Sequence, residues 1–167
     1  MSEPHFPTVG SVKLVPISVT DSHSVVDEVI VEFAGFLKGQ RGLSSVNALS
    51  AARLECDREI AEMKNSKNSG IYVVMHEGLG NVGHIWIAQR NIPEPNTWHI
   101  LYIAISPTYR RRGLAASGLQ CVLDAARRQG VDVITLNVSS TNVPALALYR
   151  SLGFKPYSRG WVKRINR

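Results

Sequence analysis

The stretch from Ile103 to Ala115 contains the residues best suited to bind an anion. A β-rich apolar segment is followed by Pro107, by three consecutive arginines at positions 110 to 112, and by Gly113 at the start of a helical pattern. A helix start directs backbone N–H groups and a positive dipole to one place, so a phosphate could bind there. The pattern also fits an ordinary strand–turn–helix junction with a solvated basic cluster, because it is neither a P-loop nor a three-glycine dinucleotide fingerprint.

A second group of residues begins at Asn142, which is a good helix N-cap. The helix that follows carries Tyr149 two turns in, and Gly153 stands at the position of a C′ glycine. A tyrosine at such a place is either a core residue whose hydroxyl finds a partner or, as a neutral phenol, a proton donor. The local pattern leaves both interpretations open.

Together the two stretches resemble the GNAT superfamily of acetyl-CoA-dependent N-acetyltransferases. The pattern RxxGxA at 110–115 is similar to the family's pyrophosphate-binding motif, and IAIxP at 103–107 is similar to the strand that precedes it. The pattern NxxAxxLYxxLGF at 142–154 is similar to the family's later motif. The specific likeness covers residues 98–154, and the order of the predicted elements extends it to most of the chain.

The resemblance implies an α/β (α+β) GNAT-like fold. This fold has a central mixed, mostly antiparallel twisted sheet of about seven strands, flanked by about four helices. It also implies a single N-acetyltransferase domain over residues 1–167, with a flexible beginning, and direct transfer of an acetyl group from acetyl-CoA to a primary amine.

By the same likeness, backbone N–H groups of Arg111 to Ala116 hold the CoA pyrophosphate, and the main chain of Ile103 to Ile105 pairs with the pantetheine arm like an added strand. Tyr149 then protonates the departing CoA thiolate as general acid. The residues implied in binding acetyl-CoA are Ile103, Ala104, Ile105, Arg110, Arg111, Arg112, Gly113, Leu114, Ala115, Ala116, Asn142 and Tyr149.

The resemblance does not fix the group that removes the proton of the amine. Some relatives have a glutamate five residues before the motif asparagine, but that position here is Asn137, which cannot act as a base. His99 and His84 fall on or beside predicted strands and titrate near neutrality, and Glu94 lies in a loop. His99 is the candidate general base, and His84, Glu94 and a water relay to backbone carbonyls are the alternatives.

Hydrophobic periodicity predicts the elements that must position these residues. The predicted strands are Val12–Ile17 at a sheet edge, Ile71–Met75, Val82–Ala88, Trp98–Ile105, Val131–Val138, Phe154–Tyr157 and Trp161–Ile165. The predicted helices run from the caps at 20–22 to Gly39 or Gly42, and over Ser45–Met63, Arg112–Gln129 and Val143–Leu152. Leu54 is expected on a buried helix side, and Gly118 is expected to allow a helix to approach the sheet closely.

The composition narrows the classes of partner. The 167-residue chain has 19 basic and 13 acidic residues, a net charge of +6 that suits an anionic partner. Outside positions 110–112 the basic residues are scattered, and no nucleic-acid-binding motif is present, so no nucleic acid is expected. No apolar run has the roughly 18 residues of a membrane span, so no membrane is expected. Cys56 and Cys121 fall in helical patterns, which predicts reduced thiols in a cytoplasmic protein without a metal.

Two other functions stay open at this stage. One is a non-catalytic acyl-CoA-binding or sensor module on the same fold, because fold does not fix function. The other is a nucleic-acid-binding domain driven by the net charge. The amine acceptor is expected to be a small molecule or a peptide or protein amine, such as a polyamine, an aminoglycoside or a peptide N-terminus. A homodimer through the predicted edge strand Trp161–Ile165 is a further expectation.

Overall fold

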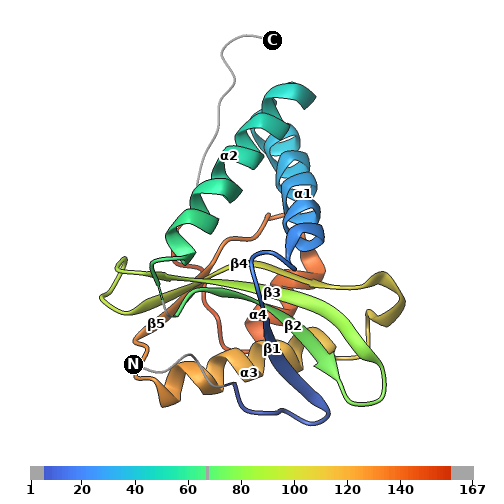
Figure 1. Ribbon diagram of the computed structural model, residues 1–167, viewed down its shortest axis with the longest axis vertical. Coiled ribbons are helices and arrows are strands. Elements are labelled where there is room, and N and C mark those ends of the chain that lie inside the picture. The colour runs from blue at the N-terminus through green and yellow to red at the C-terminus, as the bar shows by residue number, and fades with distance from the viewer. Residues whose placement is uncertain (1–5, 67, 159–167) are drawn as a thin grey trace. The chain divides into compact units, whose positions relative to one another are not determined.

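The computed structural model describes residues 6–66 and 68–158 of the chain (Figure 1). The chain divides into two compact units. The first combines residues 1–22 with residues 62–137, and the second combines residues 23–61 with residues 138–167. In the described part of the chain, no helix is both long enough and apolar enough to cross a bilayer.

The first unit is built on a five-stranded sheet with the order β1-β2-β3-β4-β5. The strands are β1 (Val12–Ile17), β2 (Gly70–His76), β3 (Gly80–Arg90), β4 (Thr97–Ile105) and β5 (Val133–Leu136). The first four pair antiparallel, and β5 pairs with β4 in parallel. The predicted mixed, mostly antiparallel sheet and the edge position of β1 are therefore confirmed.

The predicted number of about seven strands is wrong for the described residues, which form five. The predicted strand Phe154–Tyr157 is irregular chain, in which Pro156 has no N–H to give to a strand ladder and the Tyr157 side chain is 74% exposed. The predicted strand Trp161–Ile165, and with it the proposed dimer edge, lies outside the described residues.

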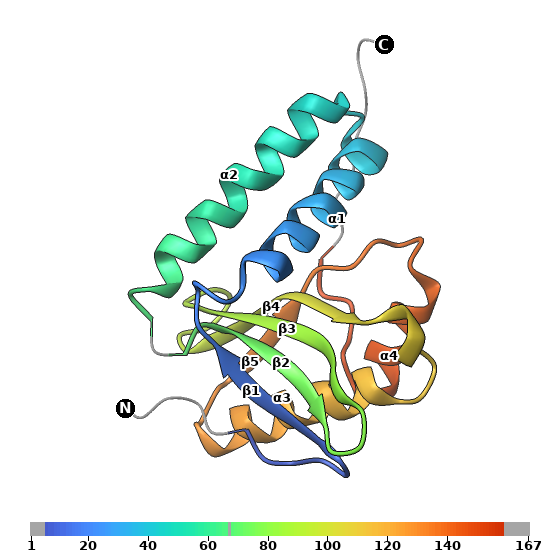
Figure 2. The same ribbon diagram turned by 45° about the vertical axis from the view of Figure 1, so that its right-hand side comes forward.

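The helix α3 (Leu114–Arg128) crosses one face of this sheet (Figure 2). Gly118 lies where the helix meets the strands, and a Cβ there would come within 3.2 Å of the Ile85 Cδ1 atom and 3.6 Å of the Val74 methyl groups. Because a larger residue would push the helix off the sheet, Gly118 has the packing role predicted for it.

The two cysteines are buried and free. Burial raises the pKa of the Cys121 thiol, whose Sγ lies 3.7 Å from the Val12 carbonyl oxygen. Burial and the neighbouring Asp57 carboxylate raise the pKa of Cys56 to about 11. Both side chains are therefore protonated thiols at neutral pH, and their role is packing rather than nucleophilic chemistry.

The second unit contains α1 (His23–Arg41), most of α2 (Ser45–Met63) and α4 (Val143–Ser151). α1 and α2 lie side by side as a helical hairpin in both views (Figures 1 and 2). The bounds of α2 are those predicted from the sequence. The prediction for Leu54 is wrong, since its side chain is 74% exposed, whereas Cys56 and Glu59 are buried. Together with α3, the described residues form four α-helices, as expected.

Candidate functional site

The turn between β4 and α3 is fixed by its own backbone hydrogen bonds. The Ser106 N–H donates to the Val82 carbonyl at 2.9 Å, and the Tyr109 N–H donates to the Ser106 carbonyl at 2.9 Å, which closes a short 3₁₀ turn over Pro107–Tyr109. Arg111 and Gly113 then take left-handed backbone conformations, with φ values of 64° and 77°. The chain therefore folds tightly before α3 begins.

This fold leaves a run of backbone donors without acceptors. The N–H groups of residues 111–116 donate to no group among the described residues, and the first bonded amide of α3 is that of Ser117, which donates to the Gly113 carbonyl at 3.0 Å. A Cβ built on Gly113 would meet nothing within 4 Å, so the space above the turn is open. Amides gathered at a helix start, with left-handed residues among them, form an anion-binding concavity.

The three arginines of the turn differ in what they contact. Arg110 folds back, and its Nε donates to the Ile105 carbonyl oxygen at 2.8 Å, so it braces the end of β4. The Arg112 guanidinium lies 5.8 Å from the centre of the Tyr109 ring, a cation–π contact. Arg111 is exposed. The arginines thus add positive charge around the turn, and one of them holds its shape.

β4 extends beyond the strand that flanks it. Pairing with β5 runs only from Thr97 to Ile100, and Ile103–Ile105 have no strand partner on that side among the described residues. We call these three residues the open edge. Just before them, Leu101 is an extra residue that β3 does not match, which makes a β-bulge. The open edge therefore lies directly before the turn in the chain, past the end of the pairing between β4 and β5.

Gly83 sets the spacing of β3 and β4 beside the open edge. It pairs with Ile105, and a Cβ at position 83 would lie only 2.1 Å from the Ala104 carbonyl oxygen and 2.9 Å from the Ile105 Cα. Only glycine allows the two backbones to come this close.

His99 connects β4 to β5 at the next-to-last pair of the two strands. Its Nδ1 lies 2.7 Å from the Thr135 Oγ1 atom, and its Nε2 lies 3.5 Å from the Asn137 Nδ2 atom. Burial, and then the charge of Arg90, lower the pKa of His99 below its usual 6.5. The imidazole is therefore neutral at pH 7 and can accept a proton.

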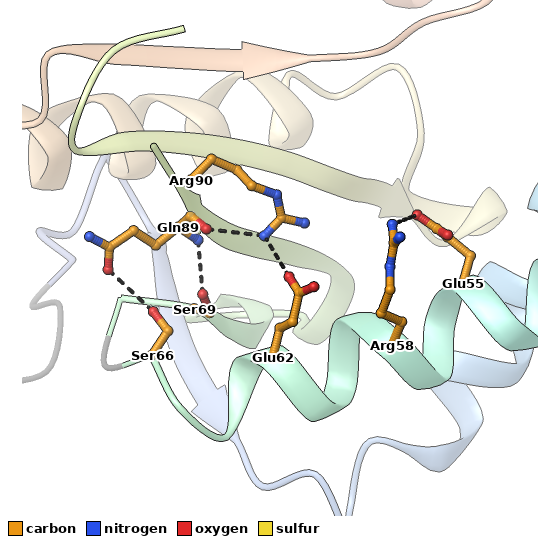
Figure 3. Close-up of polar contacts among 7 residues, drawn as sticks. All are labelled: Glu55, Arg58, Glu62, Ser66, Ser69, Gln89 and Arg90. Atoms are coloured by element: carbon orange, nitrogen blue, oxygen red, sulfur yellow. Dashed lines mark hydrogen bonds and ion pairs between the residues drawn. The ribbon is translucent and has the colours of Figure 1, made fainter. Parts of the chain in front are cut away.

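Arg90 is itself held at the end of β3 (Figure 3). Its Nη1 donates to the Gln89 carbonyl at 3.0 Å and lies 3.5 Å from a carboxylate oxygen of Glu62. The Gln89 N–H donates to Ser69 Oγ at 2.8 Å, and Ser66 Oγ donates to Gln89 Oε1 at 3.2 Å. These contacts fix the cation that lowers the pKa of His99.

The other candidate bases lie in different places. His84 pairs across the sheet with Ala104, and its Nε2 lies 3.4 Å from the Asn81 Nδ2 atom. Glu94 is exposed in the loop before β4, where its carbonyl accepts a hydrogen bond of 2.8 Å from the Thr97 hydroxyl.

The second unit holds the predicted residues of α4. The Asn142 Oδ1 accepts from the Ala145 N–H at 3.2 Å, and Gly153 has a φ of 86°, so the predicted N-cap and C′ glycine are confirmed. Tyr149 is half-buried, its ring lies 5.9 Å from that of Phe154, and burial raises its pKa above 10. It is therefore a neutral phenol at physiological pH. The roles of Asn142 and Tyr149 toward a ligand stay predictions.

The comparison with family models decides the family. The model described as "Acetyltransferase (GNAT) family" matches residues 43–154, a stretch that includes the turn, the open edge and α4. The chain belongs to the GNAT acetyltransferase family. The resemblance found in the motifs at 110–115 and 142–154 is thereby confirmed.

Curated GNAT relatives match part of the chain. The [ribosomal protein bS18]-alanine N-acetyltransferase of Escherichia coli (strain K12) is 42% identical over 52 residues, which are 31% of this chain and 35% of the relative. The N-alpha-acetyltransferase RimI of Mycobacterium tuberculosis is 34% identical over 99 residues, 59% of this chain and 58% of the relative. The matches therefore span between about a third and three-fifths of these relatives.

Solved structures of similar fold match nearly the whole chain. The Bacillus subtilis protein YycN has a TM-score of 0.82 at 18% identity, covering 93% of this chain and 99% of that one. The PaiA N-acetyltransferase of Thermoplasma acidophilum, solved in complex with coenzyme A, has a TM-score of 0.64 at 17% identity, covering 90% and 94%. At these identities the likeness shows a GNAT fold.

Sequence reasoning missed Thr135 as the partner of His99. A signal was present, because Thr135 and Asn137 are two positions apart in a predicted strand and therefore point to the same side of it. The register between β4 and β5 decides which residues of β5 lie beside His99, however, and the sequence pattern does not reveal this register.

Proposed function

We propose that the protein is an N-acetyltransferase that transfers the acetyl group of acetyl-CoA to a primary amine. The observation that carries this proposal is the turn at 111–116, whose backbone N–H groups donate to no group among the described residues, beside the open edge of β4. A nucleotide pyrophosphate and an extended, amide-containing arm are the two ligand groups that such a pair of features suits. Membership of the GNAT family supports the same ligand.

In this proposal the turn and the strand hold two neighbouring parts of the cosubstrate. The N–H groups of residues 111–116 bind the pyrophosphate, and the open space above Gly113 lets the phosphate approach the backbone. Arg111 and Arg112 add charge, and Arg110 braces the turn through the Ile105 carbonyl. The main-chain groups of Ile103–Ile105 pair with the pantetheine arm, and Asn142 contributes from the start of α4.

The chemistry is direct attack of a neutral amine on the thioester carbonyl. A C–N bond forms, a backbone N–H on β4 stabilises the oxyanion, and the C–S bond then breaks. The departing thiolate takes its proton from the Tyr149 hydroxyl, which is present because burial raises the pKa of this phenol. The acetylated nitrogen, which is positively charged after the attack, releases one proton to water, and the phenolate takes up one proton from water.

The acceptor is an amine of a peptide, a protein or a small molecule. Two relatives, a bS18-alanine N-acetyltransferase and an N-alpha-acetyltransferase, favour a peptide or protein N-terminus as the first acceptor to test. An aminoglycoside is the second, because the aminoglycoside N-acetyltransferase AAC(6′)-Iy has a similar fold, with a TM-score of 0.56 at 15% identity.

The test combines binding with turnover. Purified protein is titrated with acetyl-CoA in a calorimeter, and CoA release is followed with peptides of differing N-terminal residue, aminoglycosides and polyamines. We expect binding, and CoA release with at least one class of amine. Binding without release from any amine would support a non-catalytic acyl-CoA-binding module instead.

The variant Gly113→Glu should abolish acetyl-CoA binding, because its carboxylate fills and charges the phosphate position. Gly80→Glu is the matched control, since Gly80 has nearly the same backbone conformation (φ 73°) and equally open surroundings at the β2–β3 turn. Retained binding in Gly113→Glu would contradict the assignment of the turn.

A further inference from the structure

His99 occupies the point where β4 and β5 stop pairing. Its strand neighbour Ile100 forms the last pair with Leu136, and the chain of β4 then continues through the bulge at Leu101 to the open edge. Through the Thr135 hydroxyl at 2.7 Å the imidazole also bridges the two strands. The ring therefore has a fixed place beside the last pair of β4 and β5.

This place bears on where the acetyl group would lie in the proposed function. The pyrophosphate-binding turn follows Ile105, so an arm that pairs with the open edge runs from the turn back toward Leu101. The strand from Ile105 to Leu101 is about 13 Å long at the usual rise of about 3.3 Å per residue. The thioester end of the arm thus comes to the last β4–β5 pair, beside His99. His84, which pairs with Ala104, lies toward the pyrophosphate end.

Both hydrogen-bond partners of His99 can donate and accept. With Nδ1 protonated, the ring donates to the Thr135 oxygen, and the Asn137 amide N–H points toward the lone pair of Nε2. When Nε2 gains a proton, the Asn137 carboxamide can present its oxygen instead, and the Thr135 bond is unchanged. The ring can therefore take up and release a proton without losing either partner.

The contact on Nε2 is the weaker of the two. Its distance of 3.5 Å to Asn137 is at the upper limit for a hydrogen bond, whereas the Thr135 contact is short. Nε2 is therefore the ring nitrogen that a ligand amine can approach while the short Thr135 contact still holds the ring.

The charges around His99 keep it in its basic form. Arg90 on β3 faces the same side of the sheet, and Glu62 at the end of α2 pairs with Arg90 at 3.5 Å. β5 and the residue after it contribute the neutral side chains of Thr135 and Asn137, and α3 lies across the opposite face. Burial and the Arg90 charge both lower the pKa, so the ring is the neutral imidazole at pH 7.

We propose that His99 Nε2 accepts the proton that the acceptor ammonium loses before attack, and that Thr135 and Asn137 are positioning residues that hold the ring for this step. The proposal rests on the proposed function. The ammonium N–H bond breaks, the proton moves to Nε2, and the neutral amine keeps the electron pair that forms the C–N bond. The imidazolium then returns the proton to water.

The first test compares two histidine variants of the full chain with the best amine of the screen. His99→Gln keeps a side chain that can bond Thr135 and Asn137 but cannot titrate. We expect kcat to fall about 10²- to 10⁴-fold, the usual range for a lost general base, with unchanged affinity for acetyl-CoA. His84→Gln is the matched control and should keep kcat within about twofold of wild type. A loss of kcat in His84→Gln with normal His99→Gln would overturn the proposal.

The second test uses the pH profile, which a merely structural role would not move. The wild-type kcat/KM should fall on the acid side with a midpoint below 6.5, and this acid limb should be absent in His99→Gln. Arg90→Gln removes the cation that lowers the pKa, so it should move the limb to higher pH, and it should have no such effect in the His99→Gln background. An acid limb that persists in His99→Gln overturns the proposal.

A third measurement does not depend on turnover. The nitrogen shifts of the His99 ring in wild-type protein, assigned by comparison with His99→Gln, should show the neutral Nδ1–H form at pH 7. An Nε2–H form would overturn the proposal even if the enzyme is active. A wild-type protein that binds acetyl-CoA but acetylates no amine would instead defeat the proposed function, and with it the step assigned to His99.

Discussion

Replacing Gly113 with alanine tests the anion-binding turn at the level of a single methyl group. Gly113 has a φ of 77°, and an L-residue in this left-handed region costs about 1–2 kcal/mol. Gly80 has a φ of 73° and is equally open, so Gly80→Ala carries the same backbone cost at a distant turn. In a chain of this size we expect both variants to lose roughly 2–8 °C in Tm.

The affinity for CoA should differ between the two variants. The methyl group at position 113 stands in the open space where the phosphate approaches residues 111–116, and the loss of one hydrogen bond to a charged group costs about 1.5–3 kcal/mol. This corresponds to a rise in the Kd for CoA of about 10- to 150-fold in Gly113→Ala. Gly80→Ala should bind CoA as the wild type does.

Calorimetric titration with CoA measures the Kd of each variant, and thermal unfolding measures its Tm. A wild-type CoA affinity in Gly113→Ala would refute the placement of the pyrophosphate at this turn. A similar loss in both would show that backbone strain, rather than the filled phosphate position, weakens binding.

Three further predictions concern other residues. Tyr149→Phe should lower kcat about 10²- to 10⁴-fold and leave the acetyl-CoA Kd unchanged. The assay is the rate of CoA release, and a wild-type rate would contradict the acid role. Gly83→Ala should raise the KM for acetyl-CoA and cost about 1–3 kcal/mol of unfolding free energy, because its Cβ meets the Ala104 carbonyl at 2.1 Å; a denaturant titration equal to wild type would contradict this. Cys56 and Cys121 should react with a disulfide reagent at pH 8 only after unfolding, since both thiol pKa values are raised, and rapid labelling of the native protein would disagree.

The features that the sequence could predict are local ones. The N-cap at Asn142, the C′ glycine at Gly153 and the bounds of the helix Ser45–Met63 each depend on residues within a turn or two. The turn at 110–115 was predictable for the same reason, because a strand, a glycine and a helix start are adjacent in the chain.

The features that the sequence could not predict depend on distant parts of the chain. Phe154–Tyr157 has the residues of a strand, but a strand needs a partner, and none pairs with it among the described residues. Leu54 is apolar yet exposed, since the face that α2 buries is set by what packs on it. The contact of His99 with Thr135 follows from the strand register, and the bond from Arg110 to the Ile105 carbonyl follows from how the turn folds back.

The bulge at Leu101 shifts the phase of β4. Side chains alternate along a strand, so His99 and Tyr102, three positions apart, would normally lie on opposite faces. With Leu101 unmatched, His99 stands opposite Ala88 and Tyr102 stands opposite Trp86, which places both on the face away from α3. Without the bulge, Leu101 would take the place of Tyr102 opposite Trp86, and every later residue of β4 would turn to the opposite face. The register between β3 and β4, as much as the identity of the residues, thus decides which side chains share the face of His99.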